Sequence, residues 1–268
     1  MTPADLPALE PLAEGRNVHR SEYERFLRLE GARGLVLESE GGLVGAITLL
    51  RCFARAVVGP TLLAPGADGP GVSLALLGAA VEQLQRDGVV LAEAEAGEVE
   101  APLLSAMGFR ELRRTLVLER PASPLAGAST TRGMEMGDLL DVGALDADAV
   151  GYGRKEFLVA LQDDVRVTDD RGEVTGFVAT RRARRGRHLG PLVTRAGHED
   201  AAHRLLRDAV ATVAPSPVVT LVPEDGALLP ALRELGFAPV GGLMRMRAGE
   251  APPPAFSREW LVGSRLTG

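Results

Sequence analysis

The sequence has little of several residue types, and each shortage excludes a class of structure. Cys52 is the only cysteine among 268 residues, which excludes an internal disulfide and a cysteine metal cage. No apolar run approaches the roughly 20 residues that a membrane-spanning helix needs. The opening stretch, MTPADLPALEPLAEGR, carries acids and prolines where a signal peptide would be basic and then apolar. We therefore expect a cytoplasmic protein with no membrane partner.

Basic charge is also scarce. The chain has 30 Lys and Arg residues against 36 Asp and Glu, which gives a formal net charge of −6. This balance makes nucleic acid unfavourable as the main partner, because phosphate binding needs a basic surface. One basic run, RRARRGR at 181–187, has no neighbouring aromatic residue. It is either a solvated turn or, as a third hypothesis for the function, an RNA contact.

What the sequence does contain is a repeat. A composition of 46% hydrophobic and 25% charged residues is typical of a globular protein, and the length allows two domains. Gly45 and Gly176 are offset by 131 positions, and so are the Gly-Pro pairs at 59–60 and 190–191. The Gly-Phe pairs at 108–109 and 236–237 are offset by 128 positions. Near-constant offsets predict two copies of one α+β unit; the alternative is two unrelated domains whose turns coincide.

Hydrophobic periodicity and turn residues predict the same order of elements in both copies. In the first copy we expect a helix from Ser21, a hairpin over 34–53, a strand over 56–65, a helix over 72–86, a strand over 89–94, a helix over 100–106 and a strand over 113–120. In the second copy we expect a helix over 137–145, strands over 164–170, 174–182 and 188–194, a helix over 199–210, a strand over 218–222 and a helix over 228–235. The predicted organisation is an N-terminal domain at 1–122, a linker at 123–133, a C-terminal domain at 134–249 and a tail at 250–268.

A glycine-rich turn lies between the predicted strand ending at Pro65 and the helix that follows. Glycines at 66, 69 and 71 allow backbone amides to approach a ligand closely. The first turn of a helix also has unpaired amides and the positive end of the helix dipole, which suits a phosphate. Most such loops are only turns, so the loop needs support from the rest of the chain.

This arrangement resembles the GNAT superfamily of N-acyltransferases. In that family a strand ending in proline leads to a loop of pattern (Gln/Arg)-Gly-x-Gly-x-(Gly/Ala) and then to a helix with a leucine pair. Pro65, the run Asp68-Gly69-Pro70-Gly71-Val72-Ser73 and Leu76-Leu77 fit this pattern, and the two Gly-Phe pairs are a second hallmark. The resemblance implies an α+β fold of two tandem GNAT-like domains, each a mixed, mostly antiparallel sheet flanked by helices.

The resemblance also implies a cofactor, acetyl-CoA as the acyl donor, bound by the first copy. The residues that it assigns to the cofactor are Leu62, Leu63, Ala64, Asp68, Gly69, Pro70, Gly71, Val72 and Ser73. Asp68 stands where Arg or Gln is usual and places a negative charge near the pyrophosphate. In the second copy the loop at 197–202 keeps one glycine and contains two acids and a histidine, so we expect that domain to be degenerate.

Candidate catalytic groups come from both copies. Glu93 and Glu95 alternate onto one face of a strand, where paired carboxylates can raise one pKa and supply a general base; the alternative is a solvated strand end. Tyr152 is a further catalytic candidate, and Arg154 is a candidate for holding an acidic group of the acceptor; the alternative is a helix-edge aromatic beside a surface ion pair.

Two further expectations concern what the site lacks. The position at which many GNAT members carry an acidic tyrosine is Leu104 in the first copy and Leu232 in the second. His198 and His203 are at positions i and i+5 of one predicted helix, so one helix face cannot present both, and we expect no metal site.

The sequence therefore predicts an acyl-CoA-dependent N-acyltransferase, with acetyl-CoA as donor and an amine of a small molecule as acceptor. The alternative is a non-catalytic acyl-CoA-binding sensor or interaction module. A homodimer is compatible with either function.

Overall fold

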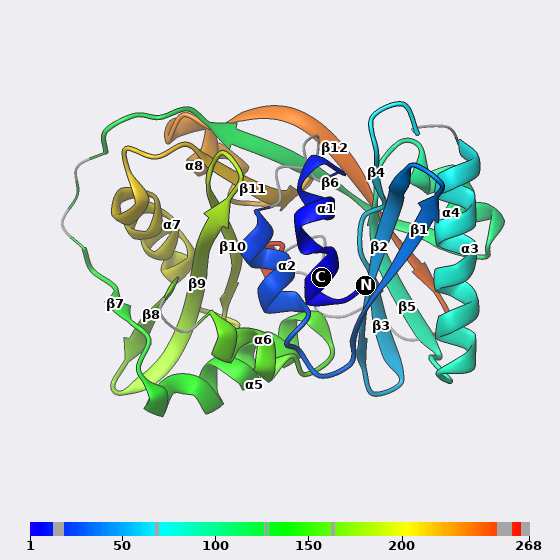
Figure 1. Cartoon of the computed structure of the whole chain (residues 1–268). Coiled ribbons are helices and arrows are strands. Elements are labelled where there is room, and N and C mark those ends of the chain that lie inside the picture. The colour runs from blue at the N-terminus through cyan, green and yellow to red at the C-terminus, as the bar shows by residue number, and fades with distance from the viewer. Residues whose placement is uncertain are drawn as a thin grey trace. The chain divides into compact units, whose positions relative to one another are not determined.

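The computed structural model describes residues 1–12, 19–67, 70–125, 127, 129–161, 164–250 and 259–263. Within them the chain divides into two compact units, whose elements are labelled in Figure 1. Unit 1 contains the described residues of Met1–Arg114 and Leu243–Ala251. Unit 2 contains those of Thr115–Gly242 and Pro252–Ser264.

Unit 1 is built from helices on either side of a twisted sheet. Its elements are η1 (Pro3–Asp5), α1 (Leu6–Leu12), α2 (Arg20–Phe26), β1 (Ala32–Ser39), β2 (Gly42–Cys52), β3 (Arg55–Val58), β4 (Leu62–Leu63), α3 (Pro70–Arg86), β5 (Leu91–Ala96), α4 (Glu100–Ala106) and the beginning of β6 (Arg110–Arg120). The sheet runs β1-β2-β3-β5-β12, where β12 is Ala238–Ala248 near the C-terminus. Only β3 and β5 are parallel among these neighbouring pairs.

The core of unit 1 lies between this sheet and α3. Leu76 and Leu77 of α3 pack with Ile47 of β2 and with the alanines of β5. The helix approaches β2 so closely at Gly45 that an added Cβ would lie 2.8 Å from Leu76 Cδ1. The Leu62 carbonyl oxygen would lie 3.1 Å from the same Cβ, so the glycine allows the helix and β4 to pack closely against the strand.

Unit 2 repeats the plan. Its elements are the end of β6, β7 (Arg132–Gly133), η3 (Met136–Asp138), α5 (Leu139–Val150), α6 (Lys155–Ala160), β8 (Val165–Asp170), β9 (Glu173–Ala183), β10 (Gly186–Thr194), α7 (Glu199–Val213), β11 (Val218–Pro223), α8 (Leu229–Glu234), the beginning of β12, and β13 (Glu259–Leu261). The sheet runs β6-β11-β10-β9-β8-β7, with β13 paired to β10. Here β10 and β11 form the parallel pair.

The repeat of the sequence is also seen in the strand ends and the strand register of the two units. Strands β2 and β9 are offset by 131 positions at both ends. A register shift follows the pair Leu37↔Gly45 in unit 1 and the pair Thr168↔Gly176 in unit 2, which are again 131 positions apart. The predicted fold class is confirmed: each unit is α+β, with a mixed, mostly antiparallel sheet flanked by helices.

The units do not coincide with the two halves of the sequence. Strand β6 begins in unit 1, but its residues 115–120 pair with β11 in unit 2. Strand β12 begins in unit 2, but its residues 244–248 pair with β5 in unit 1. The boundaries expected at 122 and 249 follow the sequence repeat, whereas the structure divides the chain inside these two strands.

Candidate functional site

The centre of unit 1 is the point where two strands separate. Strands β3 and β5 are paired as far as Val58↔Ala94. The chain then bends through Gly59–Thr61 and continues as β4, which pairs with β2 alone among the described strands. Leu62 and Leu63 of β4 thus leave β5, and we call this divergence the splay of unit 1. It leaves backbone edges that can hydrogen bond to an extended ligand.

The predicted cofactor residues Leu62, Leu63 and Ala64 line this splay. Leu62 is buried and pairs with Ala46, Leu63 pairs with Gly45, and the Ala64 amide donates to the Val44 carbonyl at 2.9 Å. These bonds all face β2. The structure therefore brings the three residues together on the strand that borders the splay.

The N-terminus of α3 follows directly. Helix α3 begins at Pro70, so the amides of Gly71 and Val72 belong to its first turn and lack helical acceptors. A Cβ on Gly71 would meet no atom within 4 Å, so the space beside its backbone is open. Ser73 Oγ is fully buried and has no hydrogen-bond partner in the part of the chain that the structure describes. An orphaned hydroxyl beside free amides fits a polar ligand such as a phosphate.

Two predicted cofactor residues, Asp68 and Gly69, lie outside the described residues, as does the side chain of Pro70. Their assignment stays a prediction from the sequence.

The carboxylates of β5 are not a solvated strand end, because Glu93 and Glu95 are each only 5% exposed. Their partners come from β12, which lies near the C-terminal end of the chain. Arg245 Nη2 donates to Glu93 Oε2 at 2.9 Å, and Arg247 Nε donates to Glu93 Oε1 at 2.8 Å. Burial by itself would raise the pKa of Glu93, but the two guanidinium groups outweigh it and hold the pKa below its usual value.

The raised pKa expected from pairing two carboxylates therefore does not occur at Glu93, since cations surround it. Arg245 also contacts the second carboxylate: its Nη1 lies 3.5 Å from Glu95 Oε1. Glu95 also follows Ala94 in the chain, so it lies just past the last β3–β5 pair, whereas Glu93 lies before it. Of the two, Glu95 is thus nearer to the splay.

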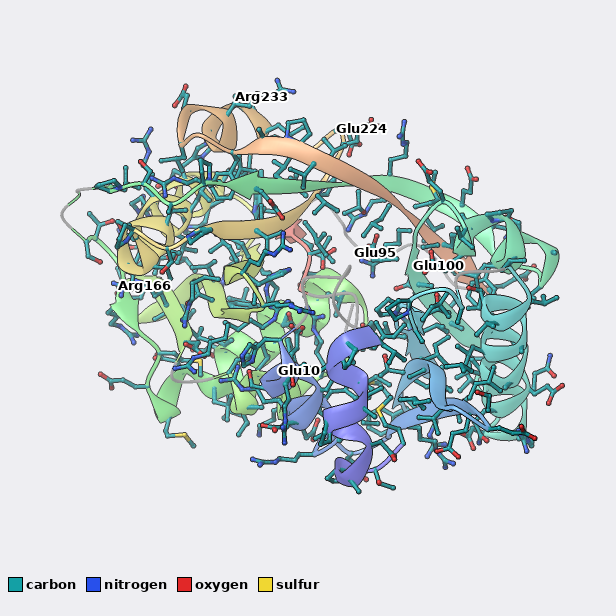
Figure 2. All side chains as sticks on the ribbon, turned by 45° about the horizontal axis from the view of Figure 1, so that its top comes forward. Glu10, Glu95, Glu100, Arg166, Glu224 and Arg233 are labelled. Atoms are coloured by element: carbon teal, nitrogen blue, oxygen red, sulfur yellow. The ribbon has the colours of Figure 1, made fainter. Side chains whose placement is uncertain are left out.

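Glu100 is a carboxylate that sequence reasoning missed; it is labelled with Glu95 in Figure 2. It is 3% exposed at the start of α4, accepts a hydrogen bond from Thr61 Oγ1 at 2.8 Å and accepts another from the Gly97 amide at 3.0 Å. These bonds join the segment before β4 to the end of β5, and so hold the base of the splay. An acid in the first turn of a helix is an ordinary local pattern, but the burial of Glu100 has no local signal in the sequence.

The β12 arginines were also missed, although a signal existed. The alternation in LMRMRA at 243–248 places both arginines on one face of a strand. It gives no indication of the partner strand.

Tyr152 and Arg154 lie in unit 2, between α5 and α6. Arg154 is 2% exposed and binds Asp146 through two bonds, Nε to Oδ2 at 2.7 Å and Nη2 to Oδ1 at 2.9 Å. Burial by itself would lower the pKa of Arg154, but Asp146, Tyr152 and Glu259 keep it above its usual value. The expected surface ion pair is therefore a buried one, and its guanidinium is already occupied.

The leucines at the tyrosine position are core residues. Leu104 and Leu232 are at most 1% exposed and belong to the hydrophobic cores of units 1 and 2. Neither position can supply an acid.

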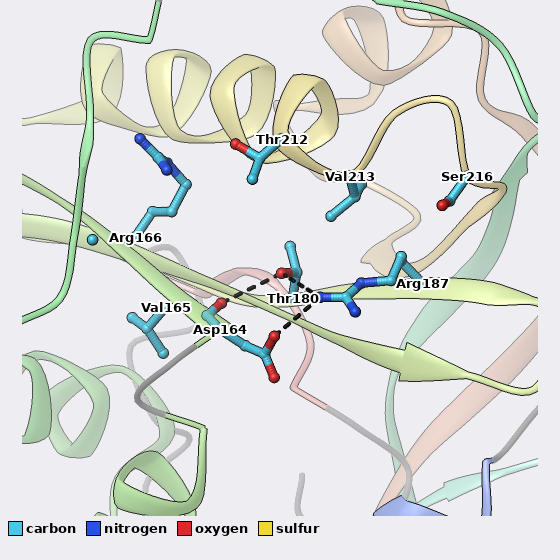
Figure 3. A pocket seen from close by; sticks show the side chains of 9 residues that line it. Asp164, Val165, Arg166, Thr180, Arg187, Thr212, Val213 and Ser216 are labelled. Atoms are coloured by element: carbon cyan, nitrogen blue, oxygen red, sulfur yellow. Dashed lines mark hydrogen bonds and ion pairs between the residues drawn. The ribbon is translucent and has the colours of Figure 1, made fainter.

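Figure 3 shows a cavity of about 410 Å³ in unit 2, near the C-terminal end of α7. Arg187 Nη2 donates to Asp164 Oδ1 at 3.0 Å across it, and Arg166 donates to Ser129 Oγ and to Thr131 at its rim. None of the predicted site residues lines it. Its charged groups join β10 to Asp164, which precedes β8, and join β8 to the segment before β7.

The basic run at 181–187 is only partly a solvated turn. Arg181 is 1% exposed and donates to the Gly190 carbonyl at 2.6 Å, while Arg187 binds Asp164. Two of its five arginines are therefore engaged inside unit 2 and do not form part of an exposed RNA surface.

The described residues have neither a metal-binding cluster nor a helix suited to a membrane. They contain no group of three or more His, Cys, Asp or Glu side chains placed to hold a metal ion. In the same part of the chain no helix is long and apolar enough to cross a membrane.

Comparison with known proteins shows that one segment of the chain is similar to a known domain family. Residues 142–259 match the family model described as an acetyltransferase (GNAT) domain. No curated protein matches the chain significantly.

Several solved structures share the fold. A proposed acetyltransferase from Pyrococcus horikoshii is 19% identical, with a TM-score of 0.81 over 100% of this chain and 94% of its own. A GCN5-related N-acetyltransferase from Sphaerobacter thermophilus is 18% identical, with a TM-score of 0.67 over 96% of both chains. A tandem GNAT protein from the clavulanic acid biosynthesis pathway is 19% identical, with a TM-score of 0.61 over 91% of this chain and 94% of its own.

Proposed function

Because residues 142–259 match a GNAT acetyltransferase domain model and the chain shares the fold of solved GNAT proteins, we propose that it is a GNAT-type N-acyltransferase whose unit 1 binds an acyl-CoA, with acetyl-CoA as the donor, and transfers its acyl group to an amine of a small molecule. The observation that supports unit 1 is its splay, bordered by Leu62 and Leu63 and followed by the first turn of α3. The family model, by contrast, matches the second half of the chain. Which unit binds the donor is therefore the first point to test.

The residues at the splay of unit 1 and at the start of α3 suit an acyl-CoA. The edges of the splay would hold the pantetheine arm, and the amides of Gly71 and Val72, with the orphaned Ser73 hydroxyl, would hold phosphate oxygens. Asp68 and Gly69 are assigned to the same loop from the sequence alone. When bound, an acyl-CoA supplies the activated thioester that an amine attacks.

We assign the general base to Glu95. A base must lie where it can reach the attacking amine, and Glu95 lies just past the last β3–β5 pair, nearer to the splay than Glu93, whose oxygens accept hydrogen bonds from Arg245 and Arg247. Glu93 then acts through Arg245, which it shares with Glu95, and is a positioning residue rather than the proton acceptor.

The roles of Tyr152 and Arg154 remain proposals from the resemblance. The bond of Arg154 to Asp146 supports a positioning role for the arginine, which would hold the loop that carries Tyr152. A direct grip on an acidic acceptor would require this pair to open.

Isothermal titration tests the binding step. We expect acetyl-CoA to bind at micromolar to millimolar concentration, and Ser73→Ala to weaken it while Ser105→Ala, a change on α4 away from the loop, leaves it unchanged. No heat of binding at millimolar acetyl-CoA would refute the proposal.

The alternative function is a non-catalytic acyl-CoA sensor, which the core positions of Leu104 and Leu232 favour. Thiol release across a panel of small amines separates the two: turnover supports the enzyme, and binding without turnover supports the sensor. The cytoplasm, the small-molecule acceptor and a homodimer are proposals from composition and resemblance.

A further inference from the structure

Unit 2 has its own splay, at the position equivalent to that of unit 1. Its parallel strands β10 and β11 are paired as far as Leu189↔Thr220, and Leu189 is offset from Val58 by the same 131 positions as the rest of the repeat. After Gly190–Pro191, strand β10 resumes pairing with β9 at Leu192↔Val178. Strand β11 continues to Pro223 and pairs on its other side with β6. The same two strands thus separate in both units.

The splay of unit 2 is occupied by the chain itself. Strand β13 pairs with β10 at Leu192↔Leu261 and Val193↔Glu259. On the other side, the Val262 amide donates to the Leu221 carbonyl at 2.9 Å. The segment 259–263 therefore hydrogen bonds to both of the strands that diverge.

The side chains of this segment pack into unit 2 and hydrogen bond to it. Leu261 and Val262 are fully buried, and Leu261 belongs to the core of unit 2. Trp260 Nε1 donates to Thr194 Oγ1 at 2.8 Å. Gly190 allows the close approach, since its φ is +132° and an added Cβ would lie 2.5 Å from the Val262 carbonyl oxygen.

A buried arginine holds the end of the segment. Arg181 donates through Nη1 to the Gly190 carbonyl and through Nη2 to the Gly263 carbonyl. One guanidinium therefore ties the bend in β10 to the residue that follows β13 and Val262. These contacts are those of an integrated strand of the unit.

We propose that the segment 259–263 is a built-in occupant of the unit 2 splay, which takes the place that the pantetheine arm of an acyl-CoA takes in unit 1. Unit 2 is then a GNAT domain closed to the donor, and each chain binds a single acyl-CoA. The proposal rests on the proposed function in taking the unit 1 splay as the donor site.

The helix that follows β10 supports this assignment. Helix α7 begins at Glu199, with Glu199 and Asp200 in its first turn, where α3 has no acid. Two carboxylates at a helix N-terminus compete with a phosphate for the same amides. Both parts of a donor site, the splay and the phosphate loop, are therefore already filled in unit 2.

Native mass spectrometry and hydrogen exchange of the full chain test the proposal together, with CoA as the probe. By mass spectrometry we expect one CoA per chain. By hydrogen exchange we expect the amides of 259–263 to exchange at least about 100-fold more slowly than in an unstructured peptide, both with and without saturating CoA. Two CoA molecules per chain, or loss of this protection when CoA is added, would overturn the proposal. Protection without any CoA binding would support the filled splay and refute the proposed function, so the two failures are distinguishable.

A pair of variants tests the docking of the strand. Leu261→Asp places a charge in the core, and we expect exchange of 259–263 to rise about 10-fold or more while CoA binding by unit 1 is kept. Leu140→Asp makes the same change at a side chain of α5 that is 73% exposed, and we expect no effect. If Leu261→Asp does not fold, Trp260→Phe removes only the bond to Thr194 and still accelerates exchange. Unchanged exchange in both tail variants would contradict a docked strand.

Discussion

At the scale of single residues, the two carboxylates of β5 differ in how the arginines of β12 hold them. Glu93 accepts hydrogen bonds from Arg245 at 2.9 Å and from Arg247 at 2.8 Å, whereas Arg245 Nη1 lies 3.5 Å from Glu95 Oε1. On this basis, and because Glu95 lies nearer to the splay, we propose that Glu93 acts as an anchor and Glu95 as the base.

This difference is testable by two matched substitutions. Glu93→Gln leaves two buried guanidinium groups short of counter-charge, so we expect a loss of about 3 kcal/mol in the free energy of unfolding, measured in urea. Glu95→Gln removes the proposed proton acceptor, and we expect kcat to fall about 100-fold or more with a smaller loss of stability. Glu38→Gln, on an exposed edge of β1, is the control for both. Equal effects on stability and kcat in the two variants would contradict the division of roles.

His188 of β10 makes the free energy of unfolding depend on pH. Burial and the neighbouring Arg181 hold the pKa of His188 well below its usual value, so the folded protein keeps the ring neutral. The unfolded chain takes up a proton near pH 6.5, and the free energy of unfolding therefore falls as the pH drops through that value.

Thermal melts between pH 7.5 and 5.5 measure this term. We expect His188→Leu to have a flatter dependence of Tm on pH than the unchanged chain. Parallel curves would show that the histidine is not buried in the neutral form.

Glu93 contributes to stability in a separate pH range. Its lowered pKa gives stability that is present at neutral pH and is lost only below about pH 4.5.

At the scale of elements, α3 and α7 begin in the same place in their units but present different groups. Helix α3 begins with Pro70-Gly71 and has a buried, orphaned Ser73 hydroxyl, whereas α7 begins with Glu199 and Asp200. The strands before them splay in the same way. The difference in donor binding that we propose therefore arises from the loops and from β13, and not from the sheet.

Two glycines of α3 allow a matched test of its N-terminus. At both Gly71 and Gly78 an added Cβ would meet no atom within 4 Å, so a leucine is tolerated at either position. We expect Gly71→Leu to weaken acetyl-CoA binding about 10-fold or more, because its side chain enters the space beside the first-turn amides. Gly78→Leu, further along the helix, leaves the affinity unchanged. An equal affinity for both variants by titration would remove the helix N-terminus from the donor site.

At the scale of the whole molecule, each unit needs a strand that the sequence repeat assigns to the other half. Residues 244–248 of β12 complete the sheet of unit 1 beside β5, and residues 115–120 of β6 complete unit 2 beside β11. Neither half of the sequence holds a full set of strands for its own unit.

Fragments of the chain test this dependence. A fragment 1–122 lacks Arg245 and Arg247, which leaves Glu93 buried without its counter-charges and the edge of β5 unpaired. We expect it to show no cooperative thermal transition by circular dichroism, and addition of a peptide of residues 238–250 to restore one. A cooperative melt of the fragment alone would show that β12 is dispensable.

Much of the fold could be predicted because its signals are local. The glycines at 45 and 176, the Gly-Pro pairs and the helix of residues 100–106 all follow from spacing and periodicity, and the structure has them at those positions. The candidate site was predicted less completely. Leu62, Leu63, Gly71 and Ser73 are brought together, but the arginines around Glu93 were not foreseen.

The sequence by itself predicted a tandem α+β fold and a resemblance to an acyltransferase superfamily, because both rest on short local patterns and on a repeat with an offset near 131. Only the tertiary structure decided that Glu93 is anchored by Arg245, 152 residues away, and that residues 259–263 lie in the second splay. The physical reason is that strand pairing between distant segments depends on complementary edges and buried charge. A sequence pattern shows that such an edge exists, but it does not show which strand will pair with it.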